Sequence, residues 1–191
     1  MKKLIALILC AALLICGAAM AETAGDPGSL KMGSFEITYK MPEDYRLSTL
    51  EYSTTSFVGL ISSEKEGTPR VDISIQFNDE YTEYDEAAGT HKALRLNDIP
   101  EDIMQEIKDS FLEQLTTAEF EEKETAHGTK LLIVRGNLDE TTPVVAIYTI
   151  YQSYEIELVA SMGQGSDATL TDTQIQSFID FLSDMDFNEI K

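Results

Sequence analysis

Acidic and aromatic side chains gather in one irregular stretch of the chain, from Asn78 to Asn97. Carboxylates beside an imidazole can transfer protons, bind calcium weakly or present charge to a partner protein. Exposed tyrosine is enriched at protein interfaces. Because the stretch lacks hydrophobic periodicity, we predict a long loop with one short helical turn. The candidate binding residues are Asp79, Glu80, Tyr81, Tyr84, Asp85, Glu86 and His91.

Catalysis by proton transfer to a histidine would have to use His91 or His127, the two histidines of the chain. A Ser-His-Asp triad also needs a positioned serine, and the sequence has no G-x-S-x-G segment. His127 precedes Gly128 in a predicted turn, where a structural role explains it. A secreted hydrolase using either histidine with nearby carboxylates stays an alternative function, and no catalytic residue is assigned.

Three further segments resemble ligand-binding patterns. Residues 163–168 match a dinucleotide-binding turn, but the predicted helix starts after them and no second parallel strand follows. Residues 184–189 start like a calcium loop, but its central glycine and final glutamate are missing. The acidic residues of 119–124 have strand spacing and do not converge. Weak calcium binding is the third alternative, and we predict no cofactor and no assigned metal ligand.

The N-terminus has the three parts of a secretory signal peptide. Two lysines follow Met1, an uncharged apolar run spans 4–19, and Ala19-Met20-Ala21 matches the cleavage pattern. We therefore predict that residues 1–21 form a signal peptide cleaved after Ala21, which gives an extracytoplasmic protein. A retained membrane anchor and a lipoprotein modified at Cys16 are the other interpretations.

Cleavage would change the chemistry of the chain. It removes both cysteines, Cys10 and Cys16, so the mature chain would form no disulfide. Loss of the two signal lysines takes the formal net charge from −20 to −22. This charge argues against nucleic acid as a partner and, after cleavage, against anionic membranes. We predict a flexible leader over 22–33 and a single domain over 34–191.

Hydrophobic periodicity predicts the elements that must position these side chains. Alternating residues predict strands, the last of them short, over 34–41, 45–53, 55–63, 70–77, 119–125, 129–135, 143–151, 154–162 and 186–187. One helix is expected to start at Asp98, as its N-cap, and another at the capping box of Thr171 to Gln174. This order predicts an α+β fold with a central antiparallel sheet of about six to seven strands, covered by two main helices.

Several segments resemble the PsbP/Mog1-like fold group. They are FEITYKMPEDYRL from Phe35, HGTKLLIV from His127, VVAIYTIY from Val144, YEIELVAS from Tyr154, and the closing helix with its Asp186-Phe187 strand. The chain departs from the pattern at Tyr45, where many relatives have tryptophan. The resemblance implies an α/β sandwich and a non-enzymatic adaptor or assembly role. It implies no particular binding residue.

The sequence thus favours an exported, non-catalytic binding or assembly domain with a protein partner. The acidic, tyrosine-containing stretch from Asn78 to Asn97 is its predicted working surface.

Overall fold

The computed structural model describes residues 27–163, 166 and 168–190. The predicted signal peptide, its cleavage after Ala21 and the first part of the leader lie outside these residues, as does part of the 163–168 motif. The rest of the predicted leader is not flexible coil, because Pro27–Met32 forms strand β1. It pairs with β2 (Phe35–Lys40), and Met32 is fully buried, so the prediction of a flexible leader is wrong over this part.

A seven-stranded sheet forms the centre of the domain, and every neighbouring pair in it is antiparallel. The α+β class, with its central antiparallel sheet and two helices, is therefore confirmed. In spatial order the strands are β3 (Arg46–Tyr52), β4 (Ser56–Ser62), β5 (Arg70–Phe77), β11 (Tyr154–Ser161), β10 (Pro143–Tyr151), β9 (Lys130–Asn137) and β8 (Thr117–Glu124).

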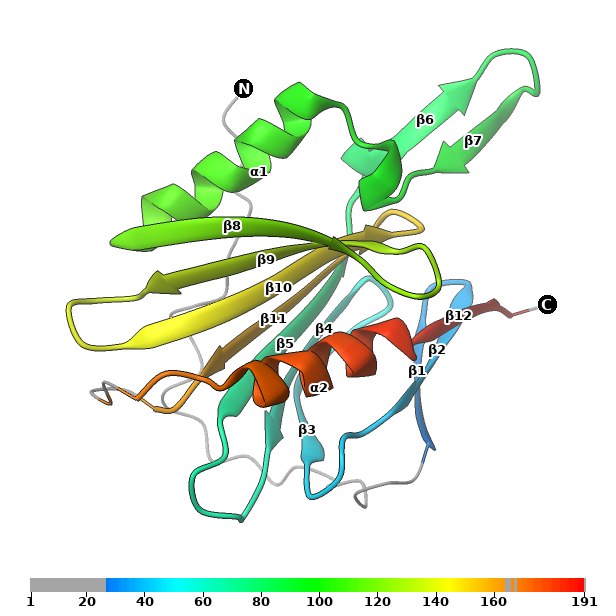
Figure 1. Ribbon diagram of the computed structural model, residues 1–191. Coiled ribbons are helices and arrows are strands. Elements are labelled where there is room, and N and C mark those ends of the chain that lie inside the picture. The colour runs from blue at the N-terminus through cyan, green and yellow to red at the C-terminus, as the bar shows by residue number, and fades with distance from the viewer. Residues whose placement is uncertain (1–26, 164–165, 167, 191) are drawn as a thin grey trace.

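Two helices cover opposite faces of this sheet (Figure 1). Strand β10 shows the division, because Ile147 packs in the core under α2 (Asp172–Ser183) and Tyr148 packs under α1 (Glu101–Gln114). Successive strand residues point to opposite faces, so a strand that is apolar throughout supplies both cores. The core between α1 and the sheet also contains Tyr81 and Leu94, which belong to the acidic stretch from Asn78 to Asn97.

A smaller sheet joins the two ends of the described domain. Strand β2 lies between β1 and β12 (Asp186–Glu189), and both pairings are antiparallel. The predicted closing strand is confirmed, and Phe187 packs at the edge of the α2 core. Among the described residues, no helix has both the length and the apolarity needed to span a membrane.

The start of α1 differs from the prediction. The helix begins at Glu101, and Pro100 occupies its N-cap without a side-chain hydrogen bond. Asp98 instead ends a short 3₁₀ helix, η2 (Leu96–Asp98), where its carboxylate accepts a hydrogen bond from the Arg95 amide at 3.1 Å. Because residues before a proline avoid helical geometry, the α-helix cannot extend back to Asp98, and the predicted cap is wrong.

The capping box of α2 forms as predicted and supports a first test. The Thr171 hydroxyl accepts a hydrogen bond from the Gln174 backbone amide at 3.3 Å, and the side-chain Oε1 of Gln174 accepts one from the Thr171 backbone amide at 2.9 Å. Thr171→Ala should lower the free energy of unfolding by about 1 kcal/mol in urea denaturation. Thr173→Ala, an exposed change in the first turn, is the control. Equal losses in the two variants would contradict the cap assignment.

The stretch from Asn78 to Asn97 is an ordered hairpin, so the prediction of a long loop is wrong. A 3₁₀ helix, η1 (Asp79–Tyr81), leads into β6 (Thr82–Asp85), which pairs with β7 (Thr90–Ala93). The two strands form a sheet of their own and extend away from the seven-stranded sheet (Figure 1). The single predicted helical turn corresponds to η1.

Candidate functional site: a projecting acidic arm

We call Thr82 to Ala93 the arm, because this hairpin projects from the body of the domain (Figure 1). Every residue from Glu83 to Lys92 is exposed. Its strands pair from Thr82 opposite Ala93 to Asp85 opposite Thr90. An isolated two-stranded hairpin is marginally stable in water, so its shape must depend on its turn and on its attachment to the domain.

The turn of the arm is set by Asp85. Its carboxylate accepts the amides of Ala87 and Ala88 at 2.9 and 3.1 Å, and its carbonyl accepts the Gly89 amide at 2.8 Å. Gly89 has a φ of 64°, which glycine adopts without a side-chain clash. Asp85 is therefore engaged in shaping the turn.

One aromatic pair stands on the arm. Tyr84 and His91 face each other across the two strands, with ring centroids 5.3 Å apart and planes tilted by 58°. The Tyr84 side chain is 59% exposed, one of the most exposed large apolar groups among the described residues. A rigid, amphipathic ring held clear of the domain is suited to contact a partner.

The charge around this pair is acidic. Lys92 is the basic side chain of the arm, and its ammonium lies 3.8 Å from the Asp98 carboxylate. Since exposed ion pairs contribute little to stability, this contact does not fix the arm. The exposed carboxylates of the arm and of its base are Asp79, Glu80, Glu83, Asp85 and Glu86.

The base of the arm is clamped by Ser153 in the turn between β10 and β11. Ser153 donates its amide to the Leu94 carbonyl at 3.0 Å and its hydroxyl to the Tyr81 carbonyl at 2.6 Å. Its own carbonyl accepts the Asn78 amide at 2.9 Å. Gln152 and Ser153 both have positive φ, at 53° and 64°, as a two-residue hairpin turn requires. Both ends of the arm are therefore tied to one fully buried residue.

Tyr81 is buried, so its predicted role in an exposed interface is wrong. Only 6% of its surface is accessible, and it packs in the core under α1. Burial, and then the nearby Glu155 carboxylate, raise the pKa of the Tyr81 phenol well above its ordinary value. Tyr81 thus holds the arm to the domain.

Glu155, on β11, also helps to attach the arm to the domain. Its carboxylate accepts the side-chain amide of Asn78 at 3.1 Å and the hydroxyl of Tyr148 at 3.3 Å. Asn78 in turn caps η1 by accepting the Glu80 amide at 3.0 Å. Burial raises the pKa of Glu155, and its hydrogen bonds oppose that rise. We call Asn78, Tyr81, Leu94, Ser153 and Glu155 the anchor.

The predicted site residues therefore divide into three groups. Tyr84, Asp85, Glu86 and His91 lie together on the arm, Asp79 and Glu80 lie exposed at its base, and Tyr81 enters the core. Sequence reasoning missed Ser153 and Glu155 of the anchor. A signal was present for Glu155, because it interrupts one of the most apolar strand patterns of the chain.

The two histidines lie apart. His91 is on the arm, and His127 is exposed in the turn that joins β8 to β9. Neither histidine lines the cavity that lies beside α2. Among the described residues, no three side chains of His, Cys, Asp or Glu are grouped so that they could hold a metal ion.

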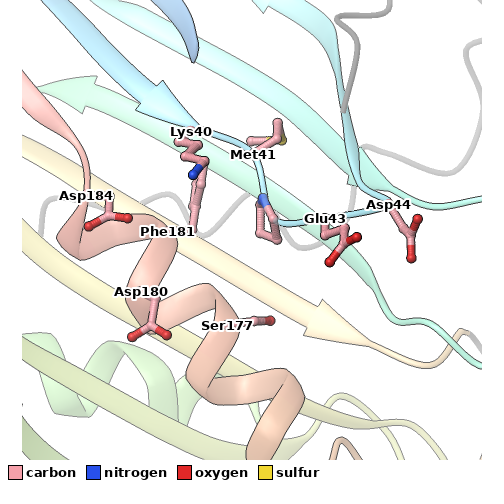
Figure 2. Close-up of a pocket in the computed structure, with 9 residues that line it drawn as sticks. Lys40, Met41, Glu43, Asp44, Ser177, Asp180, Phe181 and Asp184 are labelled. Carbon is pink, nitrogen blue, oxygen red and sulfur yellow. The ribbon is translucent and has the colours of Figure 1, made fainter. Parts of the chain in front are cut away.

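An open cavity of about 700 Å³ lies between α2 and the segment that joins β2 to β3 (Figure 2). Asp180 accepts the side-chain amide of Gln176 at 2.7 Å, and Asp44 lies 3.4 Å from the Lys65 ammonium. These acids therefore have neighbours of their own, and no predicted site residue is among the lining residues. The lining consists of Lys40, Met41, Pro42, Glu43, Asp44, Ser177, Asp180, Phe181 and Asp184.

No protein-family model matches the chain. No curated protein matches it either. Among solved structures, cyanobacterial PsbP (CyanoP) from Synechocystis is similar over 92% of this chain and 99% of its own, with 14% identity and a TM-score of 0.43. This structure belongs to the PsbP group that the sequence pattern indicated, and the relation of this chain to the PsbP/Mog1-like group stays a prediction. A likeness of this size carries nothing about ligands or partners.

Proposed function

We propose that this protein is an exported, non-catalytic binding or assembly domain that contacts a partner protein through the arm. The observation that carries the proposal is the contrast between a fully exposed hairpin and its buried, hydrogen-bonded base. A fixed base lowers the entropy cost of binding, because the arm is already ordered before it meets a partner. The N-terminal sequence supports action outside the cytoplasm.

The chemistry of the arm defines the partner. Exposed carboxylates surround the Tyr84 and His91 rings, so a complementary surface carries lysine or arginine around an apolar pocket. Aromatic anchors dominate the energy of such interfaces, and surrounding charges mainly steer association. The partner is therefore a protein with a basic, partly apolar groove wide enough for one tyrosine ring.

The test compares matched variants in cross-linked capture from the native extracytoplasmic fraction. Tyr84→Ala should weaken capture of the bound partner at least tenfold, because it removes the exposed aromatic anchor. The double variant Glu83→Gln, Glu86→Gln should slow association and make capture less sensitive to salt. Leu112→Ala, on the exposed side of α1, is the control for loss of an apolar group.

Charge has its own control. Glu101→Gln with Glu113→Gln changes the net charge by the same amount as the arm variant, but on the exposed side of α1. Equal capture by wild type, Tyr84→Ala and both double variants would refute the arm as the working surface. Equal losses in the two double variants would show a nonspecific effect of net charge, which also contradicts the proposal.

A further inference from the structure

Glu157 is a buried carboxyl group in the middle of the sheet. It lies on β11, two residues after Glu155 and on the same face, opposite Tyr148 of β10 and Ser74 of β5. Only 7% of its surface is accessible, and its Oε1 atom has no hydrogen-bond partner. An oxygen of this kind needs an explanation, because a buried polar atom without a hydrogen-bond partner destabilises the folded state.

The surroundings of Glu157 are acidic or neutral. Strand β11 supplies Glu155 and β10 supplies the Tyr148 phenol, while β5 carries Asp72 two residues from Ser74. Tyr81 and Glu80 of η1 lie near Glu155. The cation on β5, Arg70, lies opposite Ser161 and 3.3 Å from the Asp72 carboxylate. Glu157 is therefore set beside a second carboxylate without an assigned cation of its own.

This setting favours a proton on Glu157. Burial and then the neighbouring Glu155 charge raise the pKa of Glu157 to about 8. A buried carboxyl group beside a partly buried one resists a second negative charge, so the pair retains one proton well above the ordinary range of glutamate.

We propose that Glu155 and Glu157 form a proton-controlled latch on the arm. With Glu157 protonated, Glu155 keeps its hydrogen bonds from Asn78 and Tyr148, and the base of the arm stays attached to the domain. Loss of that proton puts a buried charge on Glu157 beside the charge of the partly buried Glu155, and the repulsion loosens the anchor.

The coupling runs through contacts already described. Glu155 accepts hydrogen bonds from Asn78 and Tyr148, and Asn78 caps the η1 helix that leads into the arm. Tyr81, at the end of η1, lies in the same buried group of phenols and carboxylates. Repulsion within the pair is relieved if Glu155 moves away, and that movement breaks the Asn78 contact. The effect on partner binding rests on the proposed function, whereas the latch does not.

The direction of the pH effect follows from proton linkage. The folded pKa of Glu157 is above that of the unfolded chain, so the folded state holds the extra proton between about pH 4.5 and 8. The contribution of this proton to stability is complete below about pH 4.5 and is lost as the pH rises through 8. Within that window, the Glu157 contribution raises the unfolding equilibrium constant by about tenfold for each pH unit.

Methyl and carboxyl NMR of the isolated exported protein tests the latch without a partner. The Glu157 carboxyl signal should titrate with a midpoint near pH 8, and the methyl signals of buried Leu94 at the base of the arm should change with the same midpoint. Leu158, fully buried on the opposite face of β11, is the internal control and should stay unchanged.

Glu157→Gln keeps the shape of the side chain without its charge, so the pH-dependent change in the Leu94 methyl signals should disappear. Glu155→Gln removes the neighbouring charge and should lower the midpoint of Glu157. A Leu94 step that persists in Glu157→Gln, or that is absent from wild type, overturns the latch. A Glu157 carboxyl in wild type that titrates below about pH 5 also overturns it, even if neither variant folds. None of these results depends on capture of a partner, so the latch and the proposed function can fail separately.

Discussion

Phe111→Ala should lower the free energy of unfolding by about 3–5 kcal/mol, a large fraction of the stability of an ordinary domain. Phe111 is fully buried between α1 and the sheet, and its ring meets that of Tyr148 edge to face at 6.1 Å. Its removal leaves a cavity in the core that also contains Tyr81. Chemical denaturation followed by circular dichroism measures the loss.

Leu112→Ala is the matched control, because this neighbour on α1 is 50% exposed. Its substitution should change stability by no more than about 0.5 kcal/mol. A loss below about 1 kcal/mol in Phe111→Ala would show that α1 is not held by this side chain.

Gly136→Ala is expected to cost about 3 kcal/mol, because an added methyl group has no room. A Cβ atom at this position of β9 would lie 2.2 Å from the Thr117 carbonyl oxygen and 2.8 Å from a Leu115 methyl carbon. The carbonyl belongs to the backbone of neighbouring β8, so the strand itself must shift. Thermal unfolding of the variant tests this expectation.

Gly59→Ala provides a graded comparison. Its Cβ would meet the Leu47 and Phe57 side-chain ends at 2.8 Å, and these can rotate more readily than a backbone can move. The expected cost is therefore smaller, about 1–2 kcal/mol. A larger loss for Gly59→Ala than for Gly136→Ala would contradict the distinction between backbone and side-chain clashes.

The strands of the seven-stranded sheet were predictable because their side chains alternate or are continuously apolar. Arg70–Phe77 alternates along its length, and Pro143–Tyr151 is apolar on both faces because a helix covers each of them. The periodicity of apolar side chains reflects which of them are buried, so it predicts the helices and strands that border a core. It also predicted the stripe of α1, but not its first residue, which Pro100 determines.

The arm was not predictable in the same way. Its strands border no core, and residues from Glu83 to Lys92 therefore show no burial pattern. Its shape depends on the Asp85 turn and on Ser153, which lies 72 residues away from Tyr81 in the chain. Tyr81 and Tyr84 are three residues apart and look equivalent in sequence, yet one is buried and the other exposed because Ser153 fixes the point where the arm leaves the domain.

The pairing of distant segments also governs the order in which the domain can fold. Strand β5 forms the backbone hydrogen bonds on one side with β11, and β2 forms those on one side with β12, so each pairs with a segment far along the chain. The seven-stranded sheet cannot be completed before β11 is available, and the three-stranded sheet cannot be completed before β12 is available. The core under α2 contains residues of both sheets and of α2 itself, so it closes only after these distant segments have come together, and such non-local pairing is expected to make folding slow.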